Sequence, residues 1–238
     1  MSPTSIGGQV PFDYGHEPSH LEIDFIEGDG NRLALAHIRA FPRWPGPLTL
    51  IEGPAKSGKS HLSRIWAERV GARLAEPGDI EALSRQGGMQ PVVVEDVERR
   101  GYSENALFHL LNQSMRDARP VLMTTREAIA NWPFETDDLK SRARLAARFT
   151  VALSNDIQLS QMFVKLFGDR QVAVDPKIIG YLVARMERSP EEAVALVDLV
   201  DRIALSRGTA ITRSVAAAAL AERGIGQGEL DLEGDADE

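Results

Sequence analysis

Short apolar runs alternate with helical patterns along the first two thirds of the chain. The runs that predict buried strands lie at residues 47–52, 91–94, 121–124 and 149–153. Apolar positions recur at helical spacing just after residue 60 and again across 104–117. Strands that alternate with helices predict an α/β fold with a mostly parallel sheet covered on both faces.

The pattern changes after Leu153, and only helices are predicted beyond it. The first spans residues 157–167 and is ended by Gly168. Start signals mark three more helices, namely the N-cap pair Asp175–Pro176, the capping box Ser189–Glu192 and the N-cap Thr212. The last third of the chain therefore predicts a small, all-α domain.

The most specific local motif is GPAKSGKS at residues 53–60, placed between a predicted strand and a predicted helix. Its members are Gly53, Pro54, Ala55, Lys56, Ser57, Gly58, Lys59 and Ser60. Backbone N–H groups of such a loop wrap a β-phosphate, a lysine neutralises β- and γ-oxygens, and a serine ligates magnesium. The alternative is a glycine turn that happens to contain Lys-Ser. We call residues 53–60 the phosphate loop.

Polar residues follow the next two predicted strands. Glu95 and Asp96 close the second, where one carboxylate could hold magnesium through a water and the other could polarise an attacking water. Thr124 and Thr125 end the third, within reach of a γ-phosphate. The alternatives are acids that cap a strand and ordinary strand-end threonines. With Ser60, the two acids are the predicted metal ligands.

Composition narrows the chemistry. The chain has 238 residues, no cysteine and a formal net charge of −8, so disulfides, zinc–thiolate sites and thiol nucleophiles are excluded. Residues 224–238 hold six acids and no base, which predicts a disordered acidic tail. The rest of the chain is close to neutral, which gives no sign of duplex DNA binding. No apolar run approaches a membrane span, and the N-terminus lacks a signal-peptide pattern, so we expect a cytoplasmic protein without membrane contact.

Three further segments resemble a known family. They are Phe25–Ala34, Glu104–Asn112 and Leu139–Arg142, and they flank the phosphate loop in the order found in the bacterial initiator DnaA and its shorter relative Hda, both AAA+ proteins. The resemblance covers about residues 20–223. It implies a P-loop AAA+ parallel-sheet base domain at 20–153, followed by a small helical lid at 154–223.

The resemblance also assigns roles to residues. Residues 53–60 and the following His61 would bind ADP or ATP with Mg²⁺, Gly28 and Asn31 would lie near the adenine and ribose, and Arg142 would point at a neighbouring subunit's nucleotide. The alternative for Arg142 is that it belongs to a solvated basic face, because most runs of charged residues are solvent-exposed surface.

Two positions depart from the family's pattern. Glu95–Asp96 stands where the family usually has paired aspartates, and the lid arginine of the family falls at Glu191. Arg188, one turn earlier, is the remaining candidate for a nucleotide contact, with a solvated helix-start residue as the alternative. Weak self-hydrolysis is therefore expected.

The N-terminal segment, residues 1–19, carries a motif of its own. Gln9, Val10 and Phe12 are part of a Gln-led run similar to the one by which Hda proteins dock on the replicative sliding clamp. An extended peptide would place the amide in a polar subsite and the apolar side chains in an adjoining pocket. The alternative is a disordered leader with no partner.

Three functions remain open at this stage. The first is an Hda-type adaptor that docks on the DNA polymerase III sliding clamp and stimulates ATP hydrolysis by DnaA, preventing re-initiation. The second is a self-sufficient AAA+ ATPase such as a helicase loader. The third is a small-molecule kinase that shares only the phosphate loop. A homo-oligomer is compatible with each.

Overall fold

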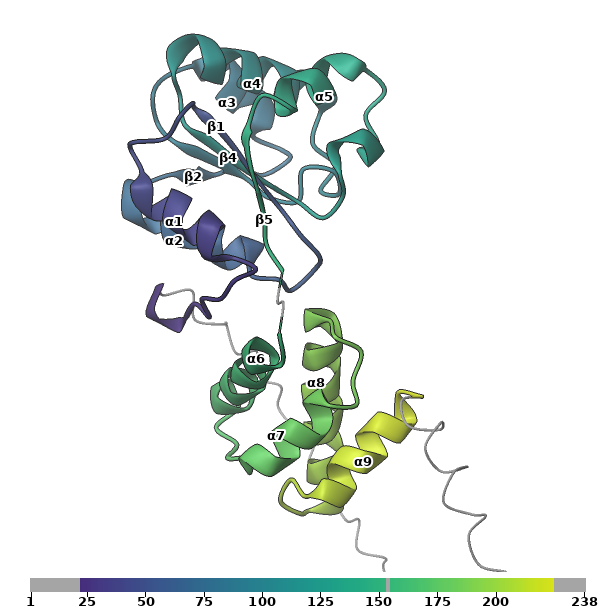
Figure 1. Ribbon diagram of the computed structural model, residues 1–238. Helices are drawn as coiled ribbons and strands as arrows, with labels where there is room; N and C mark the ends of the chain where they lie inside the picture. The colour runs from purple at the N-terminus through teal and green to yellow at the C-terminus, as the bar shows by residue number, and fades with distance from the viewer. Residues whose placement is uncertain (1–21, 153–154, 225–238) are drawn as a thin grey trace, which may run out of the picture.

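The computed structural model describes residues 22–152 and 155–224, which form a sheet domain and a helical domain (Figure 1). The predicted docking residues Gln9, Val10 and Phe12 lie outside the described residues, as does the acidic tail from residue 225 onward. The predicted domain boundary at 153–154 also falls on residues outside them.

The sheet is wholly parallel, with strand order β2-β3-β4-β1-β5. Its strands are β1 (Leu48–Glu52), β2 (Arg73–Leu74), β3 (Val92–Val94), β4 (Val121–Thr125) and β5 (Ala147–Thr150). Glu52, the last residue of β1, is in register with Thr125 on β4 and with Thr150 on β5. The loops that follow these three strands therefore begin at one edge of the sheet.

Helices cover both faces of the sheet, as predicted. On one face lie α1 (Arg32–Ala40) and α2 (Lys59–Val70), and on the other α3 (Ile80–Gln86), α4 (Glu104–Asp117) and α5 (Asp137–Ala143). Two short 3-10 turns complete this domain, η1 (Glu22–Asp24) and η2 (Ile129–Asn131).

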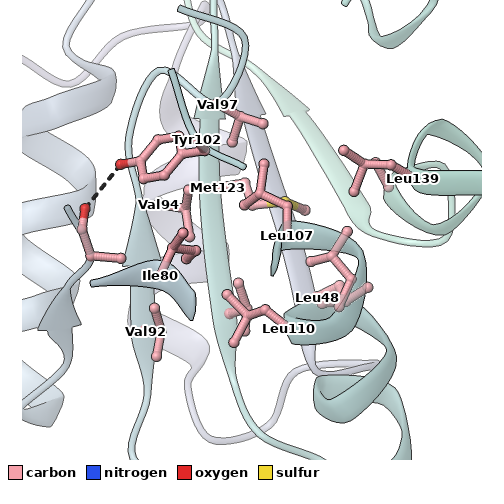
Figure 2. Packing of buried hydrophobic residues seen from close by; sticks show 14 of the residues in the cluster. Leu48, Ile80, Val92, Val94, Val97, Tyr102, Leu107, Leu110, Met123 and Leu139 are labelled. Atoms are coloured by element: carbon pink, nitrogen blue, oxygen red, sulfur yellow. Dashed lines mark hydrogen bonds between the residues drawn. The ribbon is translucent and has the colours of Figure 1, made fainter. Parts of the chain in front are cut away.

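Alternation along each strand divides the buried side chains between two cores. Val92 and Val94 of β3 face the core beneath α3–α5, whereas Val93 faces the core beneath α1 and α2. Figure 2 shows the first core, in which the Tyr102 hydroxyl donates to the backbone oxygen of Ala75 at 2.9 Å. Because both faces of β3 are buried, its three valines form a continuous apolar run in the sequence, without polar residues between them.

The helical domain has a core of its own. It contains α6 (Asp156–Asp169), α7 (Pro176–Val183), α8 (Pro190–Arg207) and α9 (Arg213–Glu222). The capping box predicted at the start of α8 is half formed, because the Ser189 hydroxyl accepts from the Glu192 N–H at 3.0 Å but the Glu192 carboxylate turns to the Arg223 guanidinium. The ion pair joins the start of α8 to the end of α9.

Contacts between α6 and residues 24–28 connect the two domains. Lys165 Nζ on α6 donates to the backbone oxygen of Asp24 at 3.1 Å. Gly28 lies against Gln158 so closely that a Cβ at Gly28 would stand 2.0 Å from the Gln158 amide nitrogen. The helical domain therefore lies directly beside the segment that leads into α1.

The sequence predictions fail where an element is short or exposed. β2 has two exposed residues, and α3 and α5 have seven residues each, too few for a convincing period. The helix α1 was not predicted, and the last strand occupies 147–150 instead of 149–153 because β5 is an edge strand with alternating burial. Among the helices in the described ranges, none has the length and apolarity that a membrane crossing requires.

A histidine links α1 to the edge strand. The His37 ring stacks between Trp44 and Phe149, with ring centroids 4.6 Å and 4.3 Å away, and its Nε2 lies 2.8 Å from Thr49 Oγ1. Burial in this aromatic setting lowers the pKa of His37 to about 4. The folded protein therefore holds this ring neutral at pH values where an unfolded chain would protonate it.

We expect folding stability to fall by about 2 kcal/mol between pH 7 and pH 5 through His37 alone. The unfolded chain takes up a proton below about pH 6.5, whereas the folded chain resists until about pH 4, so stability drops as the pH falls through this window. Urea unfolding of the wild type and of His37→Gln at both pH values measures the effect. His109→Gln, at an exposed position, is the control and should keep the wild-type pH dependence. An equal dependence in His37→Gln would contradict the assignment.

Candidate functional site

The phosphate loop connects β1 to α2 and is pinned to the neighbouring strands. The Gly53 N–H donates to the Thr125 backbone oxygen at 3.2 Å. A Cβ at Gly53 would stand 2.0 Å from the Val151 backbone oxygen, so only glycine fits between the loop and the chain leaving β5. Within the loop, Ala55, Ser57 and Lys59 are buried, Gly58 is the N-cap of α2, and Pro54, Lys56 and Ser60 are exposed.

Lys59 is a buried cation held by the loop itself. It is only 5% exposed, and its Nζ donates to the backbone oxygens of Gly53 and Pro54, both at 2.8 Å. Burial lowers its pKa, while the nearby Asp96 carboxylate acts in the opposite direction. An ammonium group that is desolvated and balanced mainly by backbone dipoles favours an anion beside it.

The Ser57 hydroxyl is a second polar group in the loop that can form a further hydrogen bond. The Ser57 hydroxyl is buried and has no hydrogen-bond partner among the described residues. Buried polar atoms are rarely left unsatisfied in native structures, and a ligand oxygen is one way to satisfy this one. The geometry therefore fits a phosphate group seated between the loop and the start of α2.

The two acids after β3 are both engaged. The Ser63 hydroxyl of α2 donates to Glu95 Oε1 at 2.6 Å. Asp96, whose φ is +46°, donates its backbone N–H to Thr124 Oγ1 at 2.9 Å and pairs its carboxylate with Arg126 at 3.2 Å. Glu95 is thus directed at α2 one turn beyond Ser60, and Asp96 is partly neutralised.

The predicted metal ligands Ser60, Glu95 and Asp96 come from the start of α2 and the end of β3. In the residues that the structure describes, no group of three or more acidic, histidine or cysteine side chains is arranged to hold a metal ion. Magnesium typically needs only one or two protein carboxylates when phosphate oxygens supply further ligands. The residues present therefore fit a metal that arrives with a phosphate.

The structure separates the two threonines at the end of β4. Thr124 lies beside Asp96, as described above. The Thr125 hydroxyl instead donates to the Glu127 backbone oxygen at 2.9 Å and accepts from the Trp132 indole at 3.0 Å. These contacts hold the Thr125 hydroxyl in the connection from β4 to η2, whereas the Thr124 hydroxyl is directed at the loop that follows β3.

Gly28, Asn31 and His61, which the resemblance assigns to nucleotide binding, lie in the segment before α1 and at the start of α2. Asn31 is buried, its Nδ2 donates to the Ile26 backbone oxygen at 2.8 Å, and its Oδ1 accepts from the Gly28 N–H at 2.9 Å. Phe25 meets His61 edge to face, with centroids 5.2 Å apart. The amide of Asn31 therefore shapes the loop at 26–31, and the Phe25–His61 pair lies at the start of α2.

The two predicted arginines take different places. Arg188 pairs with Asp156 at 3.2 Å, at the start of α6, and is exposed. Arg142 lies on α5, which packs against the sheet face opposite α2. Its guanidinium is exposed, and no residue in the described ranges pairs with it. The sheet thus lies between Arg142 and the helix that begins at Lys59.

Two charged residues near the loop, Arg126 and Glu98, were not among the predicted site residues, and Glu191 was named only as the position of a missing arginine. Arg126 follows β4 directly, Glu98 is buried beside it, and the charges of both act on the pKa of Lys59. Glu191 at the start of α8 acts on Lys59 as well. A base immediately after a predicted strand was the available signal for Arg126.

Known structures share this architecture at low sequence identity. Domain III of the replication initiation protein DnaA from Thermotoga maritima matches with a TM-score of 0.70 at 14% identity, over 87% of this chain and 98% of that chain. The T. maritima RuvB Holliday junction branch migration motor matches with a TM-score of 0.66 at 15% identity, over 86% and 72% of the two chains. AMPPCP-bound DnaA from Aquifex aeolicus matches with a TM-score of 0.58 at 17% identity, over 79% of this chain and 66% of that chain.

No protein-family model matches the sequence, and none of the curated proteins does either. At these identities the structural matches show the fold alone. The predicted fold class is confirmed: a parallel-sheet α/β domain that carries the phosphate loop is followed by a small all-α domain, the fold shared with DnaA domain III and RuvB.

Proposed function

We propose that this chain is a nucleotide-binding AAA+ adaptor that docks on the replicative sliding clamp and stimulates ATP hydrolysis by the initiator DnaA, so that initiation is not repeated. One contrast carries the proposal. The acids after β3 are tied to Ser63 and Arg126, whereas Arg142 is exposed on the opposite face of the sheet and has no pairing partner in the described ranges.

Nucleotide binding follows from the phosphate loop. Lys59, the Ser57 hydroxyl and the first N–H groups of α2 would hold the phosphates of ADP or ATP, with Gly28, Asn31 and His61 toward the nucleoside. Ser60, Glu95 and Asp96 would hold Mg²⁺, which supplies charge neutralisation of the phosphate oxygens.

The reaction in trans needs a cation that reaches another molecule's nucleotide. A phosphoryl-transfer transition state spreads charge over its oxygens, and an inserted guanidinium stabilises that charge. Arg142 has the exposure this role requires, and its side chain is not committed to an ion pair within the described residues. The partner would be ATP-bound DnaA, in keeping with the family resemblance.

Clamp docking is proposed for the segment that precedes Glu22. Gln9, Val10 and Phe12 supply one amide and two apolar side chains within four residues, which suits capture as an extended peptide. Membrane contact and sequence-specific DNA contact are not part of the proposal, and we expect the protein to act in the cytoplasm.

A self-sufficient ATPase such as a helicase loader is the second candidate. The intact phosphate loop favours it, because Lys59 and Ser57 are as available to ATP as to ADP. Against it stands the engagement of Glu95 and Asp96, the two acids after β3, with Ser63 and Arg126. Rapid hydrolysis by the isolated chain would favour this candidate.

The nucleotide site is tested with Lys59→Ala. At a hundredfold excess of Mg-ADP over its Kd, bound ligand should raise the wild-type melting temperature by about 5–10 °C, and the variant should lose this rise. Without nucleotide the two should melt at similar temperatures, because the substitution also removes the cost of burying the ammonium. Lys177→Ala, at an exposed position on α7, is the control. A wild type that ADP does not stabilise would refute nucleotide binding.

Docking is tested with the double substitution Gln9→Ala and Phe12→Ala. Binding to immobilised clamp should weaken by at least about tenfold, because two anchors of the peptide are removed. Melting temperature and ADP binding should not change, since terminal residues contribute little to a domain core. Thr4→Ala with Ser5→Ala is the matched control. Equal clamp affinity in the Gln9/Phe12 variant would show that the segment has no docking role.

The trans role is tested with Arg142→Ala in single-turnover hydrolysis of DnaA-bound ATP, with clamp loaded on DNA. Stimulation should fall by about 10³-fold or more, since an arginine finger is worth 10³–10⁵ in rate. Arg142→Lys should recover little, because an ammonium lacks the planar fork. Arg116→Ala removes an exposed arginine from the same side of the sheet and should stimulate normally. Full stimulation by Arg142→Ala would move the role to Arg144.

A further inference from the structure

An exposed apolar strip lies along α6 of the helical domain. Ile157 and Val164 are 69% and 58% exposed, and among the exposed large apolar residues of the described ranges they are the two that share a helix. Ser160 and Gln161 lie between them at helical spacing, so the four side chains share one side of the helix. We call Ile157, Ser160, Gln161 and Val164 the α6 face. Together with Asp156 they line an open hollow on the surface.

The α6 face borders the point where the described chain begins. Lys165, the residue after this face, donates from Nζ to the backbone oxygen of Asp24 at 3.1 Å. Asp24 ends η1, which begins at Glu22, the first described residue, and the intervening Ile23 is 89% exposed. Residues 1–21 therefore join the described part of the chain beside the α6 face.

The N-terminal segment has apolar side chains with a spacing that suits this face. Three of them occupy alternate positions within residues 10–14, namely Val10, Phe12 and Tyr14. In an extended peptide alternate side chains point the same way, so these three would form one apolar edge about 13 Å long. Ile157 and Val164 are seven residues apart on one helix, which is about 10 Å along its axis. The edge and the face therefore match in length and in apolar character.

Charges at the two ends of the α6 face also suit the N-terminal segment. That segment contains two acids, Asp13 and Glu17, and no lysine or arginine. Lys165 lies at one end of the face. The exposed Arg188 lies at the other end, where it pairs at 3.2 Å with the first residue of α6. An acidic segment bound along the face would therefore have a cation near each end.

We propose that residues 10–14 bind the α6 face of the same chain when no partner protein holds them. The segment approaches from the Lys165 end, so Tyr14 contacts that end of the face and Val10 contacts the other. Val10 and Phe12 are also the residues proposed to dock on the clamp, so the α6 face and the clamp compete for them. The contact with α6 does not depend on the proposed function, whereas the competition rests on clamp docking.

An attached segment suits this face better than a second copy of the chain. Stable protein–protein interfaces bury about 800 Å² on each partner, far more than two aliphatic side chains supply. Tyr14 is ten residues before Asp24, and an extended chain of that length spans about 33 Å, enough to reach every residue of the face. A connection this short gives an effective concentration on the order of millimolar. The attached peptide therefore keeps a contact that two separate molecules would lose.

Cysteine crosslinking tests the contact, because the chain has no cysteine of its own. The reporter pair is Asp13→Cys with Gln161→Cys in the full chain, and the control pair is Asp13→Cys with Ala36→Cys. Ala36 is exposed on α1, where Arg39 pairs with Glu22 at 2.6 Å, so the control position also lies beside the start of the described chain. In a glutathione redox buffer at low protein concentration, the reporter pair should form its disulfide at least about tenfold faster than the control pair.

Variants of the face show whether its apolar side chains provide the contact. Ile157→Ser with Val164→Ser should slow the reporter pair to the rate of the control pair. Leu205→Ser removes another exposed apolar side chain, from α8, and should leave the reporter rate unchanged. Phe12→Ser changes the segment alone and should slow the reporter pair as well. This last variant decides the question even if the double serine variant fails to fold.

Competition with the clamp is tested in the chain without cysteines. Ile157→Ser with Val164→Ser should bind immobilised clamp at least about threefold more tightly than wild type, because occlusion of a binding segment lowers its apparent affinity by the fraction that is open. Leu205→Ser should bind the clamp as wild type does. Unchanged affinity in the double serine variant would refute the competition.

Two results of the crosslinking would overturn the inference. Equal rates for the reporter and control pairs would show that the segment has no binding site on α6. Disulfides that join two chains would show that the α6 face receives a second copy instead. A wild type that does not bind the clamp would refute clamp docking in the proposed function, and the disulfide rates would still decide whether residues 10–14 bind α6.

Discussion

The ammonium of Lys59 is buried, and no carboxylate of the described residues is in direct contact with it. Much of the local structure follows from that. Two backbone oxygens of the loop bind it at 2.8 Å, which requires the loop to curl back over the start of α2. The curl brings Gly53 against the Val151 backbone oxygen, at a distance that only glycine tolerates. The parallel register of β1 with β4 and β5 then holds the loop between the ends of two neighbouring strands.

The acidic residues near that cation are paired with other protein groups. Glu95 is directed to Ser63 and Asp96 to Arg126, so the acids that sequence alone would assign to catalysis already have partners. Glu191 adds a negative charge from the lid to the electrostatic surroundings of Lys59. Both acids after β3 are therefore engaged by protein groups.

The elements that the sequence predicts well are those whose signal is local. A few neighbouring residues are enough to predict the buried run at β3, the N-caps Asp175 and Thr212, and the phosphate loop. The pairs that define the site are not local, since Ser63 and Glu95 are 32 residues apart and Asp96 and Arg126 are 30 apart. Their pairing depends on strand order, which no short window of sequence contains. For the same reason Glu192 suggested a complete capping box, although its carboxylate binds Arg223, 31 residues later.

The contact of Gly28 with Gln158 limits how α6 can move relative to the sheet domain. The space between Gly28 and Gln158 is too small for a methyl group, and Gln158 on α6 is only 2% exposed. A rotation of the lid that moved α6 toward the sheet domain would therefore displace the segment around Gly28. That segment continues through Asn31 into α1, so the motion would reach the helix that carries His37. Movement of α6 toward the sheet domain would therefore be transmitted to α1 through a residue that has no side chain.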